Sequence, residues 1–195
     1  IAVCDSDDIS LPDRFEKQVW FLENHPEIDV VGGQICSFWK TPVCENHNII
    51  NWPISHKDIA AGFRRYKMKV PNAAAMIRRK CFDDIGLYDE SLLRAQDYDF
   101  FKRLYYNGSL FHNLPDILVL YRQETVVATL RYFLETQTYS SYVDAKHMGL
   151  FKHFDVYRGS RLFHIVRMYL IIKYVLYYIP KMRIRLLLSK KSLEV

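Results

Sequence analysis

The stretch Ile1-Ala2-Val3-Cys4-Asp5-Ser6-Asp7-Asp8 places three carboxylates directly after a short apolar run. The apolar run is typical of the end of a buried strand, and the crevice beyond the carboxyl ends of strands is where open α/β sheets bind ligands. Crowded carboxylates repel one another unless a cation lies among them. Mg²⁺ and Mn²⁺ prefer such oxygen ligands, commonly together with substrate phosphates. The stretch therefore indicates either a metal-and-phosphate site or a solvated acidic turn before a helix, and by itself it leaves both open.

The composition bounds the architecture and the compartment. The chain has 195 residues, of which 50% are hydrophobic and 15% aromatic, enough for one domain with an appendage or for two small domains. Its four cysteines show no CxxC spacing, so we expect neither a disulfide framework nor a zinc site. Cys4 and Cys81 lie in apolar segments and are predicted to be buried thiols. A reducing cytoplasmic location is the simplest interpretation.

The hydrophobic pattern predicts alternating helices and strands in the first two thirds of the chain. Phe15, Val19 and Leu22 repeat at helical spacing and should form the buried face of a first helix. The other predicted elements are a strand over 28–38 with a bulge or close approach at Gly32-Gly33, a long loop over 39–54, helices over 55–63 and 79–85, and a small-residue strand entry over 70–77. A further helix is expected to open within 94–99 and to close at Asn107-Gly108, followed by two strands either side of Pro115. Helices are expected over 126–148 and 159–190, with breaks at Gly149 and Pro180.

A second acidic site follows at Gln96-Asp97-Tyr98-Asp99, where a helix should begin. Free backbone N–H groups and the helix dipole favour the charged form of a carboxylate there. Asp97 would then be ionised at neutral pH and able to accept a proton, while Asp99 points to another face. The alternative is that both are helix-start acids without chemistry. A metal-and-phosphate site together with a base is what sugar transfer from a nucleotide diphosphate requires.

With these stretches, the sequence resembles the family 2 glycosyltransferases of the GT-A fold, an α/β fold with a mixed sheet flanked by helices. The matching stretches, in chain order, are residues 2–12, 15–18, 29–33, 75–79, 85–90, 94–99, and 113–118 together with 121–122. Seven short matches in the right order over residues 1–122 are more specific than any single motif. The resemblance predicts a partial GT-A catalytic domain over 1–125 and a helical, basic extension over 126–195.

The resemblance implies a role for each site residue. Asp5 and Asp7 correspond to the DxD pair, which holds the donor diphosphate through Mn²⁺ or Mg²⁺, and Asp8 belongs to the same diphosphate-binding motif. Asp97 falls where inverting members have their catalytic base, and Arg94 and Gln96 are expected on the acceptor side. The expected reaction transfers a sugar from a nucleotide-sugar donor to a glycan or lipid-linked acceptor, in cell-surface polysaccharide synthesis.

The sequence also departs from the family pattern. Gln96 stands where Glu is frequent, and Gln123-Glu124 replace a His that can join the metal site, so Glu124 becomes the candidate third ligand. The nucleotide-cradling N-terminal half is missing, which predicts a truncated chain that does not turn over alone. The alternative is an inactive remnant that acts at most as a binding module. A phosphatase of the haloacid-dehalogenase type, with Asp5 as nucleophile, is disfavoured because Ile9 stands where that class has Thr or Val.

The net charge of +5 is unevenly distributed, with a basic region near the C-terminus. Residues 156–193 contain nine of the 27 basic residues and none of the 22 acidic ones. The longest uncharged run there, residues 174–180, is far shorter than the roughly 20 apolar residues that span a bilayer. We expect peripheral contact of 158–191 with an anionic membrane at its inner face. Packing on the catalytic domain or a partner remains open, and nucleic-acid binding is disfavoured because no nucleic-acid-binding motif accompanies the charge.

Overall fold

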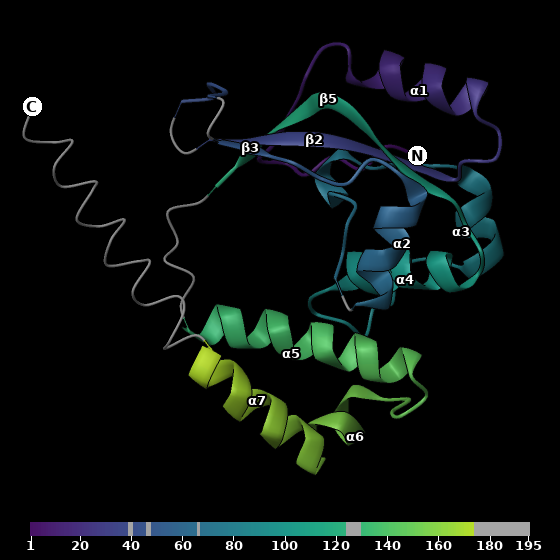
Figure 1. Cartoon of the computed structure of the whole chain (residues 1–195). Helices are drawn as coiled ribbons and strands as arrows, with labels where there is room; N and C mark the ends of the chain where they lie inside the picture. The colour runs from purple at the N-terminus through teal and green to yellow at the C-terminus, as the bar shows by residue number, and fades with distance from the viewer. Residues whose placement is uncertain (39–40, 46–47, 66, 124–129, 174–195) are drawn as a thin grey trace, which may run out of the picture. The chain divides into compact units, whose positions relative to one another are not determined.

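The computed structural model describes residues 1–38, 41–45, 48–65, 67–123 and 130–173 and contains one mixed sheet (Figure 1). Its strands are β1 (Ile9–Ser10), β2 (Val30–Phe38), β3 (Ile49–Ile50), β4 (Met76–Ile77) and β5 (Phe111–Arg122). The strand order is β1-β5-β2-β3, and β4 pairs with β2. The long pair β2 and β5 is parallel, while the other pairs are antiparallel. The predicted GT-A class, a mixed sheet flanked by helices, is confirmed.

The central strand β2 is buried along its whole length. A Cβ atom on Gly32 would lie 2.2 Å from Asn113 Oδ1, and one on Gly33 would lie 2.4 Å from Leu118 Cδ1. Both contacts are far too short, so only glycine lets β5 approach β2 this closely. The pairing with β5 shifts register on both sides of Gln34, and the predicted irregularity at the two glycines is confirmed.

Helices cover both faces of the sheet, with α1 (Arg14–Asn24) over one face and α2 (His56–Arg64) and α4 (Gln96–Tyr106) over the other (Figure 1). The Ser55 hydroxyl caps α2 by accepting a hydrogen bond from the Asp58 N–H, as the sequence predicts. A 3₁₀ turn, η2 (Asn72–Ala74), leads into β4, and α3 (Arg79–Ile85) ends at Gly86, whose φ is +80°.

The predicted buried face of α1 is wrong. Phe15 and Val19 are 46% and 44% exposed, whereas Arg14, Gln18 and Leu22 are buried. The two polar side chains are buried because backbone carbonyl groups under the helix accept their hydrogen bonds. Hydrogen bonding therefore decides which side of this helix faces the sheet, and the more apolar side faces solvent.

Three further expectations need correction. The segment before Asp5 is not a buried strand: Ala2 forms a single bridge to Met76, and Cys4 is exposed, although Cys81 is buried as expected. The two strands expected around Pro115 are one strand, β5, because the proline lies where the pairing register skips from Asn113 to Ile117 and needs no N–H. A disulfide joins Cys36 to Cys44, against the expectation of none.

The contacts of the chain divide it into two compact units, residues 1–90 with 96–125 and residues 91–95 with 126–195. The second unit contains α5 (Leu130–His147), α6 (Phe154–Arg158) and α7 (Arg161–Lys173), and α7 packs on α5 through a cluster of Leu134, Val166 and Leu170. The break at Gly149 is confirmed, whereas the break at Pro180 lies outside the described residues. In the described part of the chain, no helix is long and apolar enough to cross a membrane.

Candidate active site

The acidic stretch forms a tight turn between the Ala2 bridge and β1. The Asp8 N–H donates to the Asp5 carbonyl at 3.3 Å, which closes the turn. Asp5 and Asp7 are exposed, and Asp8 is half-buried. Burial raises the pKa of Asp8, and the neighbouring charges of Asp7 and Asp5 raise it further, against a backbone hydrogen bond that lowers it. The turn therefore presents two free carboxylates to solvent and holds a third against the protein.

Arg122, at the end of β5, fixes the other side of this turn. Its backbone N–H donates to Asp8 Oδ1 at 2.8 Å, and its Nε donates to the Asp7 carbonyl at 3.0 Å. The guanidinium lies 4.8 Å from the centre of the Phe38 ring, where a cation–π contact restrains it. The ends of β2 and β5 thus hold the turn that carries the acids.

A buried arginine on α1 binds the residues at both ends of the acidic turn. Arg14 is 1% exposed, and its guanidinium donates to the Ser10 hydroxyl at 2.8 Å, the Val3 carbonyl at 2.8 Å and Gln18 Oε1 at 3.1 Å. Burial lowers the pKa of Arg14, while Cys4 and the carboxylates of Asp5 and Asp8 raise it. The charge of the acidic turn therefore helps to keep a buried guanidinium protonated, and that guanidinium ties both ends of the turn to α1.

Sequence analysis missed the role of Arg14 and Gln18. Gln18 continues the network by donating to the Ala74 carbonyl at 2.8 Å and to the Val31 carbonyl at 3.1 Å. A signal was present, because Arg14, Gln18 and Leu22 follow one another at four-residue spacing directly after the acids. The apolar series that begins at Phe15 and Val19 was the stronger pattern, so the polar series was not recognised.

Asp97 lies in the first turn of α4, where the sequence predicts it. Its Oδ1 accepts a hydrogen bond from the Tyr98 N–H at 2.8 Å, as expected for a carboxylate at a helix start. Burial nevertheless raises the pKa of Asp97, and this effect exceeds the lowering by the backbone hydrogen bonds. Burial is therefore a larger influence on the pKa of Asp97 than the helix start, and the raised pKa suits a general base.

Electrostatic coupling connects the two acidic sites. The charge of Asp5 adds to the rise in the pKa of Asp97. Burial raises the pKa of Tyr88, and the charges of Asp97 and Asp5 raise it further. The charge of Asp5 therefore acts in the same direction on both Asp97 and Tyr88. Tyr88 is a functional candidate that sequence analysis did not identify, since nothing local distinguishes it from a core tyrosine.

The two residues expected on the acceptor side fall in different units. Gln96 begins α4 and is half-buried. Arg94 belongs to the second unit and pairs with Glu135 of α5 at 3.3 Å. Between them, Ala95 has a φ of +62°, a left-handed conformation that costs a non-glycine residue about 1–2 kcal/mol. Backbone strain of this kind is concentrated at functional sites, and here it directly precedes Gln96 and Asp97.

The acidic turn has the donor chemistry for a hard divalent cation. Asp5 and Asp7 offer exposed carboxylate oxygens, and Asp8 Oδ2 is buried without a hydrogen-bond partner among the described residues. Mg²⁺ and Mn²⁺ are commonly held by one or two carboxylates with substrate phosphates completing the shell. No group of three or more His, Cys, Asp or Glu side chains in the described part of the chain is arranged to hold a metal alone. Glu124, the candidate third ligand, lies outside the described residues.

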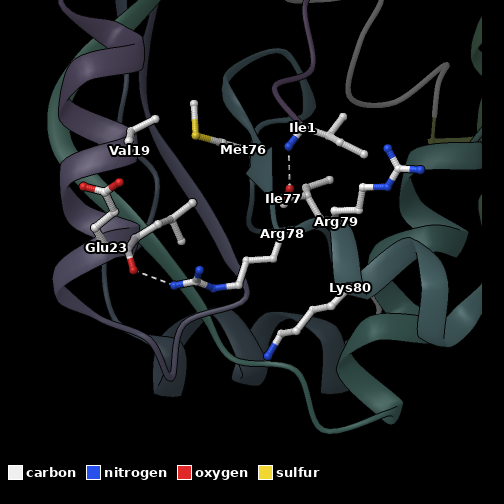
Figure 2. Close-up of a pocket in the computed structure, with 9 residues that line it drawn as sticks. Ile1, Val19, Glu23, Met76, Ile77, Arg78, Arg79 and Lys80 are labelled. Atoms are coloured by element: carbon white, nitrogen blue, oxygen red, sulfur yellow. Dashed lines mark hydrogen bonds between the residues drawn. The ribbon is translucent and has the colours of Figure 1, made fainter.

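A separate hollow of about 410 Å³ lies between α1 and the segment that follows β4 (Figure 2). In Figure 2, Arg78 reaches across it toward α1, where its guanidinium donates to the Leu22 carbonyl. Lys80 forms an ion pair with Asp29 at 2.8 Å. None of Asp5, Asp7, Asp8 and Asp97 lines this hollow, so it is not the site that the acids define.

Comparison with known proteins finds glycosyltransferases. Residues 1–86 match the model of the family described as Glycosyl transferase family 2. Over 178 residues, 88% of the chain, the sequence is 32% identical to an uncharacterized glycosyltransferase of Methanocaldococcus jannaschii, MJ1057, and covers 59% of it. Over 122 residues, 60% of the chain, it is 37% identical to an uncharacterized glycosyltransferase of Haemophilus influenzae and covers 42% of it.

A third relative carries a more specific name. Over 125 residues, 63% of the chain, the sequence is 32% identical to the amylovoran biosynthesis glycosyltransferase AmsE of Erwinia amylovora and covers 44% of it. The chain thus spans between 42% and 59% of the length of these relatives. Residues 1–86, which contain the acidic turn, belong to glycosyltransferase family 2, and the three relatives are all named glycosyltransferases.

Proposed function

We propose that the protein to which this chain belongs transfers a sugar from a nucleotide-sugar donor to a glycan or lipid-linked acceptor. The observation that carries the proposal is the acidic turn, whose exposed Asp5 and Asp7 carboxylates and unpartnered Asp8 Oδ2 suit a cation. Asp97, which is half-buried in the first turn of α4, is the carboxylate proposed for proton transfer. The family assignment supports the same chemistry.

The donor side of the reaction is assigned to the acidic turn. Asp5 and Asp7 would hold Mn²⁺ or Mg²⁺, which when bound would offset the charge of the departing diphosphate. Asp8 keeps the turn in place through its hydrogen bond to the backbone of Arg122. Arg14 and Arg122 hold the two sides of the turn through their hydrogen bonds to the Ser10 hydroxyl and the Asp7 carbonyl.

The acceptor side of the reaction is assigned to Asp97. Its carboxylate would remove the proton of the acceptor hydroxyl as that oxygen attacks the anomeric carbon from the face opposite the diphosphate, which inverts the configuration. The raised pKa of Asp97 strengthens its basicity. Gln96 and Arg94 are proposed to contact the acceptor, because they flank the strained Ala95 directly before the base.

The biological process is proposed to be cell-surface polysaccharide synthesis. One relative is named for the biosynthesis of amylovoran, and the proposal extends that kind of process to this chain. Peripheral membrane contact through residues 158–191 would bring such a protein to lipid-linked acceptors.

Two measurements test the proposal. Electron paramagnetic resonance of Mn²⁺ titrated into the purified chain with UDP, GDP or CDP should show bound cation in the wild type and none in Asp5→Asn/Asp7→Asn. Asp13→Asn, a nearby exposed acid paired with Lys17, is the matched control and should bind as the wild type does. Equal Mn²⁺ binding by Asp5→Asn/Asp7→Asn and the wild type would remove the donor-side assignment.

Transfer itself is measured in the full-length protein, with donor hydrolysis as the minimal assay. Asp97→Asn should reduce turnover by roughly 10²- to 10⁴-fold, the usual contribution of a general base, and should leave Mn²⁺ binding intact. Full activity in Asp97→Asn would show that another group accepts the proton.

A further inference from the structure

The outer side of α7 carries a continuous apolar stripe. Ile165, Met168, Tyr169 and Ile172 recur at the spacing i, i+3, i+4 and i+7, which places them on one side of a helix. Their exposed fractions are 61%, 62%, 62% and 52%. Four large apolar side chains in such an arrangement form a surface and are not isolated exposed residues.

This stripe is not needed by the core of its own unit. The opposite side of α7 supplies Phe163 and Leu170, which are 7% and 4% exposed, and Leu170 packs with Val166 against Leu134 of α5. Figure 1 shows α7 alongside α5. One side of α7 therefore builds the helical unit, and the second apolar side is left for something outside the described residues.

The positive charges in and near α7 indicate what the stripe contacts. Arg161 lies four residues before Ile165, so it is on the side of the stripe. Arg158 ends α6 and is exposed, and Arg167 lies over the Phe163 ring, away from the stripe. No acidic residue occurs between positions 156 and 193. An apolar stripe with a cation on its own side and no acid in the same stretch of sequence matches the boundary of an anionic bilayer, where long basic side chains reach the headgroup phosphates.

We propose that α7 lies flat on the surface of an anionic membrane, with Ile165, Met168, Tyr169 and Ile172 in the acyl boundary and Arg161 at the headgroups. Nucleic acid would meet the cations but leave the aliphatic stripe in water. A protein partner would need an acidic rim around an apolar groove, whereas anionic lipid supplies both chemistries at once. The inference depends on the proposed function in one respect only: the purpose of the membrane contact would be access to a lipid-linked acceptor.

The test is co-sedimentation of the purified full chain with vesicles. Vesicles of phosphatidylglycerol and phosphatidylcholine at 3:7 should bind the wild type in low salt, and pure phosphatidylcholine vesicles should bind it at least about tenfold more weakly. The triple variant Ile165→Ser/Met168→Ser/Ile172→Ser should lose at least about tenfold in binding. Arg161→Gln leaves the stripe intact and should weaken binding about fivefold, the share of one cation near such a surface.

The matched control is Trp20→Ser on α1, because Trp20 is 62% exposed, as Met168 and Tyr169 are. It should bind vesicles as the wild type does, and circular dichroism should show every variant folded. Absence of wild-type binding in low salt, or equal binding by the triple variant, would overturn the proposal. So would a wild-type dimer in sedimentation equilibrium that the triple variant abolishes, since the stripe would then contact a second copy. None of these readouts requires sugar transfer, so their failure is separable from failure of the proposed function.

Discussion

Replacing Arg14 with Met should lower the free energy of unfolding by about 2–4 kcal/mol. Methionine fills a similar volume, so the cost arises from hydrogen bonds and not from a cavity. The Ala75 carbonyl keeps the Val3 N–H as a donor at 2.9 Å. Gln18 Oε1 and the Val3 carbonyl lose the donors that the structure shows, and each unsatisfied buried acceptor costs about 1–3 kcal/mol.

Urea denaturation followed by far-UV circular dichroism measures this effect. Arg14→Lys keeps the charge but not the planar fork, so it should fall between the wild type and Arg14→Met. Trp20→Ser, on the exposed side of the same helix, should change stability by less than about 0.5 kcal/mol. If the free energy of unfolding of Arg14→Met is within about 1 kcal/mol of the wild-type value and the dependence on urea is unchanged, the buried network does not stabilise the acidic turn.

Three other predictions address the pKa of Asp97, the disulfide and the packing of β2. Because burial raises the pKa of Asp97 above its unfolded value, its contribution to stability is fully present at low pH and is lost as pH rises through the folded pKa. Asp97→Asn should therefore unfold at a higher urea concentration than the wild type at pH 7, and the difference should be smaller at pH 3. An equal difference at both pH values would contradict this prediction. Reducing the Cys36–Cys44 disulfide with dithiothreitol should lower the free energy of unfolding by about 2–3 kcal/mol for so short a loop. Cys44→Ser should lower it by the same amount, and dithiothreitol should not change the stability of that variant. Gly33→Ala should cost about 1–3 kcal/mol in the same urea assay, because the new Cβ would overlap Leu118, and wild-type stability would show that β5 can move away.

The elements that sequence patterns predicted correctly are those with local signals. Ser55 and Asp58 form their cap within one turn of α2, and Gly86 ends α3 because it alone tolerates the required φ. The β-branched run of β2 is buried on both faces, so continuous hydrophobicity identifies it. In each case the physical cause lies within a few residues of the element.

Prediction failed where the cause lies elsewhere in the chain. On α1 the apolar series of Phe15 and Val19 was the stronger local pattern, but the carbonyl groups that bury Gln18 come from β2 and η2. The pairing of Cys36 with Cys44 depends on how the chain after β2 turns back, which spacing alone does not show. Pro115 indicated a break in a strand, yet the break is a register shift that only the partner strand reveals.

The candidate site shows the same division at the level of chemistry. The types and spacing of Asp5, Asp7 and Asp97 pointed to a cation site and a base, because carboxylate chemistry can be deduced from side chains alone. The direction in which the pKa of Asp97 shifts could not be deduced, since the backbone N–H groups of the helix start lower it while burial and the charge of Asp5 raise it. Arg14 and Arg122 act through contacts with the acidic turn and the residues that flank it, which form only in the folded chain, and nothing local distinguishes Tyr88 from a core tyrosine. Burial is the largest cause of the raised pKa of Asp97, so the basicity of the proposed base is set by the fold around it and not by the motif that carries it.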